Sequence, residues 1–274
     1  MERSDAVRNL QGVAQSMKPE AQRQKLEGAV PDVLAVIMAR AGSKGLPGKA
    51  ILPLLGRPVI DYTFEHVRAA RRISRSVVSS DDPEVLRLGR EAGFEVIERP
   101  AALATDSSAT DPVLRHAVWE LGRTNDDKEN HGSRYYPDAV VMLYGNVPVR
   151  RGGMIDRCVQ MLFETGCDSV QTIAPVGKMH PYWMFDRFDD GRIAKHTKNN
   201  VFRRQELPPL FAPTGAVYVM RTEVLMVAEG SGDPHAFLGT DRRGLVVSPE
   251  DSVDIDTRRD LFLAEAVLRE MDVV

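Results

Sequence analysis

Hydrophobic residues follow two rhythms along the chain, and the two rhythms alternate. Short continuous apolar runs are typical of strands buried on both faces of a sheet, whereas apolar residues spaced three and four apart are typical of amphipathic helices. Strands are predicted at 33–38, 76–78, 95–97, 139–143, 169–173, 216–219 and 245–247. Helices are predicted at 59–67, 83–92, 111–121, 154–165 and 257–270, and a charged surface loop at 124–137. This alternation predicts an α/β fold: a Rossmann-like, mostly parallel sheet with helices on both faces.

Two segments break the alternation. Residues 1–30 are polar and rich in Gln and Arg, so we expect an extension outside the domain that occupies 31–274. Residues 178–213 contain several aromatic side chains, a turn sequence at Asp190-Gly191 and the basic pair Arg203-Arg204. We interpret this second segment as a small insertion of irregular and β structure.

Composition narrows the class of protein. The 274 residues are 43% hydrophobic and 27% charged, which is ordinary for a globular domain. A net charge of −3 provides no overall positive field for nucleic acid, and the longest apolar run, 33–39, is too short to cross a bilayer. The first thirty residues contain no apolar core of a secretory signal, and Cys158 and Cys167 have no zinc-motif spacing. We expect a cytoplasmic enzyme or small-molecule binder with buried free thiols and no nucleic-acid or membrane partner.

A glycine-rich segment directly follows the first predicted strand, where an open α/β sheet places its ligand crevice. Residues 39–49 contain three glycines and three cationic side chains, namely Gly42, Gly45, Gly48, Arg40, Lys44 and Lys49. Glycines let backbone N–H groups approach a phosphate closely, and the cations can neutralise its charge. The glycine spacing excludes a Walker A loop and a dinucleotide-binding GxGxxG motif, and Ala50 stands where a Walker Ser or Thr would bind magnesium. We therefore predict a phosphate-binding loop rather than a flexible basic turn.

A pair of acidic residues near the C-terminus forms the second candidate site. Asp254 and Asp256 are separated by one residue, and extended backbone directs alternate side chains to the same face. Two carboxylates supply the hard oxygen ligands that suit a Mg²⁺ ion bridging to phosphates. The alternative is that Asp256 only caps the helix that begins near Thr257.

Four blocks of sequence lie in a fixed order between about residues 33 and 268. They are VIMARAGSKGLPGKAILPLLGRPVIDYT, SSDDPEVLRLGREAGFEVIERPAALATDSSATDPVLRHAV, FRRQELPPLFAPTGAVYVM and DSVDIDTRRDLFLAEAVL. Together they resemble the CMP-sugar synthetases, the cytidylyltransferases for sialic acid and related nonulosonates, which typically have A-R-x-x-S-K-G-x-P-x-K-N in the first block. The resemblance implies that 31–274 is a nucleotidyltransferase domain. It would transfer CMP from CTP to an acidic α-keto sugar and release pyrophosphate.

The resemblance also implies roles for individual residues. It places the nucleotide on Arg40, Ala41, Gly42, Ser43, Lys49, Arg99 and Thr110. It places the acidic sugar beside Tyr144, Asn146, Arg204 and Tyr218. Asp254 and Asp256 would bind Mg²⁺, and with Arg40 and Lys49 they form the expected catalytic set. The insertion 178–213 resembles the family's dimerisation element, which implies a homodimer whose partner chain helps to cover the sugar site.

Several positions depart from the family pattern. Ala50 replaces the Asn that follows the loop Lys, and Tyr144 stands where the sialate enzymes have Gln. Tyr144-Gly145-Asn146 instead approaches the Q-G-D-E-P of the related KDO cytidylyltransferases, with Asn146 at the position of a metal-binding Asp. A KDO-type cytidylyltransferase is therefore one alternative. A GT-A glycosyltransferase, which also uses a D-x-D metal motif, and a degenerate, non-catalytic nucleotide binder are the others.

Simpler structural roles compete at some of these positions. Asp111 is expected to cap the helix that it begins. A surface position is the alternative for Arg99, and core packing is the alternative for Tyr218. His116 and His180 have no metal partner at motif spacing, so we expect structural roles for both.

Overall fold

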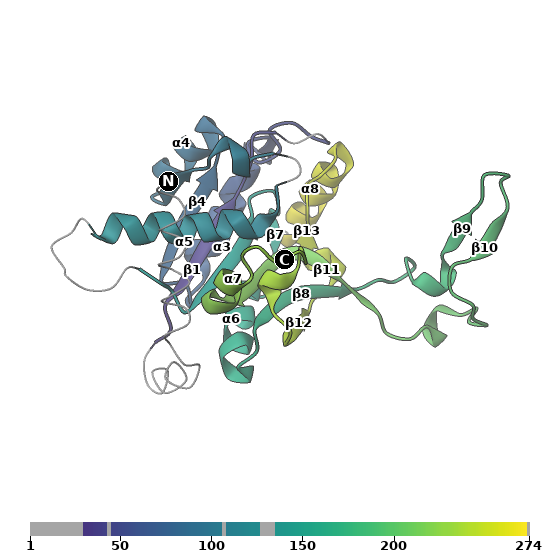
Figure 1. Ribbon diagram of the computed structural model, residues 1–274. Helices are drawn as coiled ribbons and strands as arrows, with labels where there is room; N and C mark the ends of the chain where they lie inside the picture. Colours follow the sequence, from purple (N-terminus) through teal and green to yellow (C-terminus); the bar gives the residue numbers. More distant parts are fainter. Residues whose placement is uncertain (1–29, 43–44, 106–107, 127–134, 273–274) are drawn as a thin grey trace.

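Seven strands form one central sheet in the computed structural model, which describes residues 30–42, 45–105, 108–126 and 135–272 (Figure 1). In sheet order the strands are β12 (Arg242–Val246), β8 (Ser169–Pro175), β11 (Phe211–Arg221), β6 (Ala139–Tyr144), β1 (Val33–Met38), β4 (Arg75–Ser80) and β5 (Glu95–Glu98). β11 runs antiparallel to both of its neighbours, and the other strands of this sheet are mutually parallel. The predicted mostly parallel sheet is confirmed, although the apolar pattern did not indicate the direction of β11.

Helices cover both faces of the sheet, as predicted. They are α3 (Val59–Ala69), α4 (Pro83–Glu91), α5 (Thr110–Asp126), α6 (Met154–Thr165), α7 (Thr222–Val227) and α8 (Arg258–Asp272). Alternate side chains of β1 enter two apolar clusters, so the strand is buried on both faces. Val33, Ala35 and Ile37 pack with residues of α3 and α6, whereas Leu34 and Val36 pack with residues of α5. The loop after β1 is therefore held at the carboxyl edge of a rigid sheet.

A short strand pair brings the C-terminal segment to the same edge. β7 (Val149–Arg150) pairs antiparallel with β13 (Ser252–Val253). Between β6 and β7 the carbonyl of Asn146 accepts a hydrogen bond from the Ile255 N–H at 2.9 Å. A third apolar cluster packs α8 over this region, together with the hairpin formed by β2 (Pro53–Leu54) and β3 (Arg57–Pro58). The acidic pair is thus carried next to the loop that follows β6.

An arm, residues 176–210, projects from the body between β8 and β11 (Figure 1). It contains the hairpin of β9 (Phe185–Arg187) with β10 (Ile193–Lys195) and the 3-10 helices η2 (Pro181–Trp183) and η3 (Arg204–Glu206). At its base the buried His180 accepts a hydrogen bond from the Tyr182 N–H at 3.0 Å through Nδ1, and its Nε2 lies 3.1 Å from Pro208 O. These contacts give His180 the structural role expected for it. The arm occupies most of the segment expected to be an insertion.

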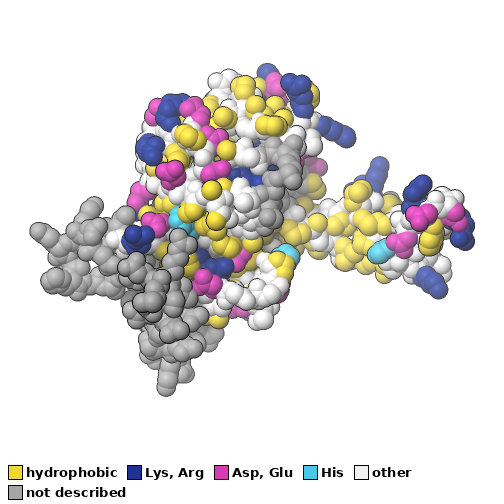
Figure 2. All heavy atoms as spheres, turned by 45° about the horizontal axis from the view of Figure 1, so that its top comes forward, with side chains coloured by type: hydrophobic (Ala, Val, Ile, Leu, Met, Phe, Trp, Pro, Cys, Tyr) yellow, Lys and Arg dark blue, Asp and Glu magenta, His cyan; other side chains and the backbone are white. Residues whose placement is uncertain are grey.

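The arm exposes many large apolar side chains, which are Met179, Met184, Phe185, Phe188, Ile193, Phe202 and Leu210. Figure 2 shows hydrophobic surface along the arm and Lys and Arg side chains towards its outer end. Phe202 is 87% exposed, which is unusual for a phenylalanine. Contiguous apolar surface of this kind marks an interaction surface.

Some boundaries differ from the sequence-based expectation. α5 extends to Asp126, so the loop predicted at 124–137 begins inside a helix, and residues 127–134 lie outside the described residues. All but the last residue of the extension 1–30 also lies outside them. Both cysteines are free and buried, as expected. Within the described chain, no helix has the length and apolar character needed to span a membrane.

Candidate active site

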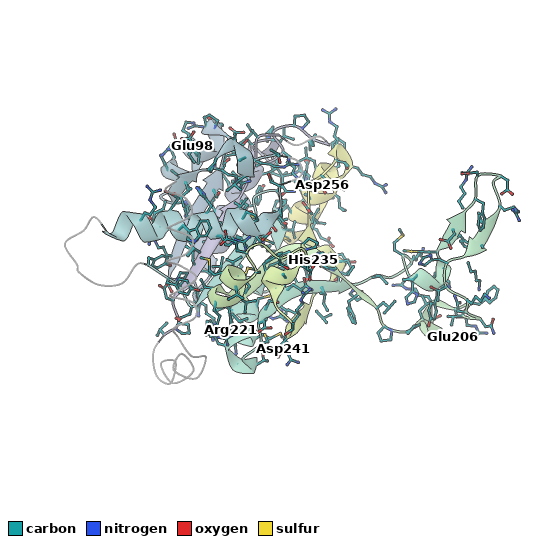
Figure 3. The ribbon with its side chains drawn as sticks, viewed as in Figure 1. Glu98, Glu206, Arg221, His235, Asp241 and Asp256 are labelled. Carbon is teal, nitrogen blue, oxygen red and sulfur yellow. The ribbon has the colours of Figure 1, made fainter. Side chains whose placement is uncertain are left out.

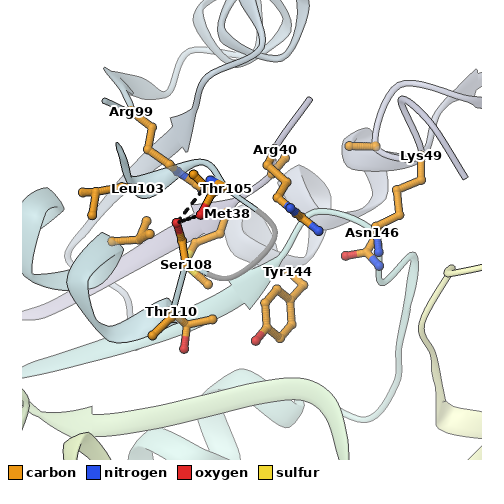
Figure 4. A pocket seen from close by; sticks show the side chains of 14 residues that line it. Met38, Arg40, Lys49, Arg99, Leu103, Thr105, Ser108, Thr110, Tyr144 and Asn146 are labelled. Atoms are coloured by element: carbon orange, nitrogen blue, oxygen red, sulfur yellow. Dashed lines mark hydrogen bonds between the residues drawn. The ribbon is translucent and has the colours of Figure 1, made fainter. Parts of the chain in front are cut away.

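A cavity of about 190 Å³, here the first cavity, opens at the carboxyl ends of β1 and β6 (Figure 4). Its polar lining residues are Arg40, Lys49, Arg99, Thr105, Ser108, Thr110, Tyr144 and Asn146. These residues are distant in sequence but meet because the parallel strands β1, β4 and β6 end at one edge of the sheet. In Figure 4 the cationic side chains of Arg40 and Lys49 lie on the side of Asn146, and Ser108 and Thr110 lie on the opposite side.

A second cavity of about 410 Å³ adjoins the first, because the two share Lys49, Tyr144 and Asn146. Its other lining residues come from β11 and the C-terminal segment and are Pro213, Thr214, Gly215, Tyr218, Asp254 and Asp256. The two connected cavities therefore bring together most of the residues that the sequence predicted at the site. Two ligands bound side by side would meet at the shared wall.

The glycine-rich loop packs directly against the acidic pair. A Cβ atom at Gly45 would lie 2.7 Å from the carbonyl oxygen of Asp256, so the chain can approach this closely only with glycine. Gly48 has a φ of +64°, a conformation that also favours glycine. Lys49 Nζ forms an ion pair with Asp256 Oδ1 at 2.5 Å. The loop after β1 and the D-x-D segment therefore form one structural unit.

Other residues of the loop contribute less than the sequence predicted. Ala41 and Gly42 are exposed and do not line either cavity. The Ala41 N–H is instead turned to the side of the loop, where it donates a hydrogen bond to Asp81 Oδ1 at 3.0 Å. Ser43 and Lys44 lie outside the described residues. Nucleotide binding by Ser43 stays a prediction.

Asp254 and Asp256 concentrate negative charge at the edge of the shared wall. Burial and the neighbouring Asp256 raise the pKa of Asp254 to about 6, while Lys49 opposes this shift. Asn146 Nδ2 donates hydrogen bonds to Asp254 Oδ1 and, at 2.9 Å, to the Ile255 carbonyl. Asn146 therefore fixes the orientation of Asp254 from the loop after β6.

This donor set fits a Mg²⁺ ion. Two adjacent carboxylates with incompletely balanced charge favour a divalent cation, and Mg²⁺ commonly takes one or two carboxylates and completes its shell with phosphate and water. No group of three or more His, Cys, Asp or Glu residues arranged to bind a metal occurs in the part of the chain that the structure describes. The acidic pair is thus suited to an ion that a phosphate ligand shares, rather than to a closed protein cage.

The helix-capping alternative for Asp256 is wrong, because other residues cap α8. Thr257 and Asp260 satisfy each other reciprocally: Asp260 Oδ2 accepts a hydrogen bond from the Thr257 N–H at 2.8 Å, and the Asp260 N–H donates to Thr257 Oγ1 at 3.4 Å. The Asp256 carboxylate is turned away to Lys49. Asp256 is therefore available at the site.

Arg99 is buried in the wall of the first cavity, so the surface alternative is also wrong. Its side chain is only 7% exposed, and Nη2 donates a hydrogen bond to the Ser79 carbonyl at 2.7 Å. Burial lowers the pKa of Arg99 to about 10, so the guanidinium stays protonated at neutral pH. A buried cation beside a cavity suits an anionic ligand.

Two tyrosines face the cavities. Tyr144 lies at the end of β6 and lines both cavities, whereas Tyr218 lies on β11 and lines the second. Burial raises the pKa of Tyr144 to about 12 and also raises that of Tyr218, so both phenols stay neutral. Tyr218 also packs against the apolar cluster under α5, so a binding role and core packing are compatible at this position.

Arg204 does not lie with the other predicted site residues. It belongs to η3 on the arm, and neither cavity of its own chain includes it. Figure 3 shows the same separation, with Glu206 of η3 far out on the arm and Asp256 on the body. Arg204 therefore lies away from the cavities of its own chain, because the insertion extends away from the sheet, and its contact with the sugar stays a prediction.

Asp111 also differs from its expected role. α5 begins one residue earlier, at Thr110, and the Asp111 carboxylate forms an ion pair with Arg115, which is 4% exposed. A buried guanidinium without a carboxylate would be costly, and this need outweighs the preference of Asp for a cap. The pairing leaves Thr110 at the start of the helix, where it lines the first cavity.

Several residues at the site were missed from the sequence. Thr105 and Ser108 line the first cavity and share a hydrogen bond at 2.7 Å between their hydroxyl groups. Arg150 is buried directly behind the shared wall and is treated below. An arginine within the apolar run V-P-V-R was the available indication, because a charged residue is rarely buried without a purpose.

Comparison with known proteins agrees with this geometry. The model of the cytidylyltransferase family matches residues 34–211. An N-acylneuraminate cytidylyltransferase from Streptococcus agalactiae is 27% identical over 232 residues, which are 84% of this chain and 51% of that protein. A CMP-N,N'-diacetyllegionaminic acid synthase from Legionella pneumophila is 26% identical over 242 residues, which are 86% of this chain and 96% of that protein. The chain thus spans about half of the first relative and nearly all of the second.

A solved structure has a similar fold. It is a CMP:2-keto-3-deoxy-manno-octonic acid synthetase complexed with CTP, with a TM-score of 0.63 and 18% sequence identity. The match covers 88% of this chain and 99% of that chain. At this level of identity the likeness establishes the fold.

Proposed function

We propose, from the premise that the chain belongs to the cytidylyltransferase family, that it transfers CMP from CTP to an acidic α-keto sugar of the nonulosonate class. Pyrophosphate is the second product. The observation that carries the proposal is the pair of connected cavities that share Lys49, Tyr144 and Asn146. CTP in the first cavity and a sugar in the second would place their reacting groups at this shared wall.

The first cavity supplies the nucleotide side of the reaction. Arg40 and Lys49 bring positive charge to the triphosphate, and the buried Arg99 adds a third cation. Thr110 and Ser108 offer hydroxyl groups on the opposite wall. These groups would hold the α-phosphate in a fixed orientation, which is the principal requirement for phosphoryl-type transfer.

The chemical step joins the two substrates directly. A hydroxyl oxygen of the sugar forms a bond to the α-phosphorus of CTP, the bond from that phosphorus to the bridging oxygen of pyrophosphate breaks, and the hydroxyl proton is released to water. Asp254 and Asp256 would hold Mg²⁺, which when bound supplies positive charge to the phosphate oxygens. Lys49, which is paired with Asp256, would add a further positive charge beside the phosphate oxygens.

A second copy of the chain would complete the sugar site. Among the described residues that line the second cavity the one cation is Lys49, which is already paired with Asp256, so none of them is a dedicated partner for the sugar carboxylate. The arm carries Arg204 outward together with exposed Phe185, Ile193 and Phe202. We propose a homodimer in which the arm of one protomer packs on the other and offers its Arg204 to the sugar carboxylate, a bidentate partner of the kind that arginine favours.

The experiment that tests the function is a pyrophosphate-release assay. CTP, UTP, ATP and GTP are each combined with sialic, legionaminic, pseudaminic and KDO-type acids in the presence of Mg²⁺. The expected result is release with CTP and a nonulosonate, with the CMP-sugar identified by mass spectrometry. CTP binding without pyrophosphate release for any acid would support a non-catalytic nucleotide binder. Pyrophosphate release only with the KDO-type acid would identify that acid, and not a nonulosonate, as the substrate. A reaction that consumes CTP also fits the expected cytoplasmic location.

A further inference from the structure

We propose that Arg150 is a positioning residue that holds the two walls of the second cavity at their correct separation. One wall is the turn after β6, which carries Tyr144 and Asn146, and the other is the segment of β11 that carries Gly215 and Tyr218. The expected effect on sugar binding rests on the proposed function. The role of Arg150 in fixing the separation of the two walls does not.

The Arg150 guanidinium joins both walls through backbone carbonyl groups. Its Nη2 donates to the Tyr144 carbonyl at 2.7 Å, and its Nη1 donates to the Val147 carbonyl at 2.6 Å. Its Nε donates to the Ala216 carbonyl on β11 at 2.7 Å. Nη1 also donates to Thr63 Oγ1 on α3 at 3.0 Å. One rigid planar group therefore fixes three carbonyls on two walls, and α3 holds that group in place.

The carbonyl on β11 needs this partner because the strand loses its register at this point. β11 pairs with β8 through Pro213 and again from Tyr218, with a register shift between them. Side chains replace the missing ladder: the Val217 N–H donates to Thr172 Oγ1 at 3.2 Å, and Arg150 takes the Ala216 carbonyl. Such irregularities often lie next to active sites, where they redirect side chains. Here the irregular segment is the one that lines the second cavity.

Stability alone is a poor reason for this arginine. Arg150 is 6% exposed, and its hydrogen-bond partners within the described chain are the oxygens of Tyr144, Val147, Ala216 and Thr63 and, at 3.5 Å, His66 Nδ1. Burial lowers its pKa to about 9 and the charge of Asp254 opposes this shift, so it keeps its charge at neutral pH in spite of the loss of hydration. Apolar residues of similar volume often stabilise a core as well as or better than a buried charge. The donor fork of Arg150 instead provides a fixed distance between the two walls.

The test compares Arg150→Met with Arg150→Lys and with the matched control Arg221→Met. Arg221 also donates to a backbone carbonyl, Cys167 O at 2.9 Å, and lies on the same strand at its other end, away from both cavities. Arg150→Met should raise the KM for the nonulosonate about tenfold or more and change the KM for CTP less, because both walls that Arg150 joins line the second cavity and only the turn after β6 also lines the first. Arg150→Lys, which keeps a donor and the charge, should recover part of the loss. Arg221→Met should leave the ratio of the two KM values at its native level.

Amide hydrogen exchange measures the structural part independently. In Arg150→Met, exchange should accelerate in 214–218 and 144–148 relative to both the native protein and Arg221→Met. If the native protein turns over no acid, the proposed function fails, and exchange still decides the role of Arg150. Unchanged exchange in both segments, or equal rises in the two KM values, would overturn the inference. If Arg150→Met does not fold, the same two readouts are applied to Arg150→Lys with the same criteria.

Discussion

The first cavity and the arm differ in how much of the proposed site a single chain provides. In the first cavity Arg40 and Lys49, from the loop after β1, meet Arg99, which follows β5, because parallel strands deliver their ends to one edge of the sheet. The arm carries Arg204 and its exposed apolar side chains away from every other candidate residue. The body is thus organised around its own core, whereas the described residues leave the large apolar side chains of the arm uncovered. Under the proposed function, nucleotide binding would be a property of one protomer, and sugar recognition would require two.

The largest effect should come from the body. Asp256→Asn removes one charge at the shared wall without changing the shape of the side chain, and turnover should fall about a hundredfold or more if the carboxylate holds the catalytic ion. Steady-state pyrophosphate release measures the loss, and thermal melting should stay close to native. Asp260→Asn is the matched control, because Asp260 caps α8; it keeps an acceptor oxygen, so it should cost no more than about 1 kcal/mol of stability and leave most of the turnover. Near-native turnover in Asp256→Asn would remove the acidic pair from the mechanism.

Loss of a nucleotide contact should have the next largest effect. Arg40 lines the first cavity directly after β1, and a charged hydrogen bond contributes about 1.5–3 kcal/mol. Arg40→Ala should therefore weaken CTP binding about 10- to 150-fold in titration calorimetry. The exposed Arg243→Ala on β12 should bind CTP with native affinity. An unchanged affinity in a folded Arg40→Ala protein would contradict the assignment of the first cavity to the nucleotide.

The arm should give a smaller and more selective effect. Arg204→Ala should raise the KM for the acidic sugar about tenfold, because it removes one charged hydrogen bond to the sugar carboxylate. The affinity for CTP should stay native. Arg192→Ala, in the hairpin of the same arm, should change neither value. Equal losses for both substrates would contradict a role in sugar recognition.

Mixed dimers sharpen the same comparison. If the arm of one protomer serves the body of the other, a dimer of Arg204→Ala with Asp256→Asn contains one intact site and one doubly defective site. Random mixing of the two variants should then give about a quarter of the sites both intact residues, and assays at a sugar concentration well below the KM measure this fraction. Activity no higher than the mean of the two variants would place Arg204 within its own protomer, or outside the site.

The apolar pattern predicted the parts of the fold that periodicity can report. β1, α3 and α6 were predicted with their observed cores because each is long and presents a regular apolar face. The two-residue strands β7 and β13 are too short for any periodic pattern, yet they bring the acidic pair to Asn146. The local pattern of hydrophobic residues predicts neither the pairing of such short strands nor the direction of β11.

The site was predictable where a motif and its position in the chain agreed. Lys49, Thr110 and Asp256 could be selected because each lies in a distinctive block and close to a strand or helix end. Arg150 could not, because its partners are backbone carbonyls, which every residue possesses. Arg204 was selected for its chemistry, but its separation from the cavities of its own chain follows from the outward course of the arm, which a local motif does not show.

The body and the arm also differ in the surroundings of their histidine side chains. His66 Nδ1 in the body lies 3.5 Å from Arg150 Nη1, and burial, followed by the charges of Arg150 and Arg57, lowers the pKa of His66 to about 3. On the arm the exposed His196 Nδ1 lies 3.0 Å from Asp186 Oδ1. The buried environment of His66 opposes protonation, so the body should lose stability in acid.

The smallest expected effect follows from this difference. The unfolded chain protonates His66 near pH 6.5, whereas the folded protein keeps it neutral down to about pH 3, so the unfolded state binds more protons in this window. Stability should therefore fall as the pH drops below 6.5, by about 1.5 kcal/mol at pH 5. Urea unfolding at the two pH values measures the change. His66→Gln should remove this part of the loss and His196→Gln should retain it, because glutamine fills much of the space of His66 without accepting a proton. A loss of native size in His66→Gln would show that other groups in the body carry the acid sensitivity.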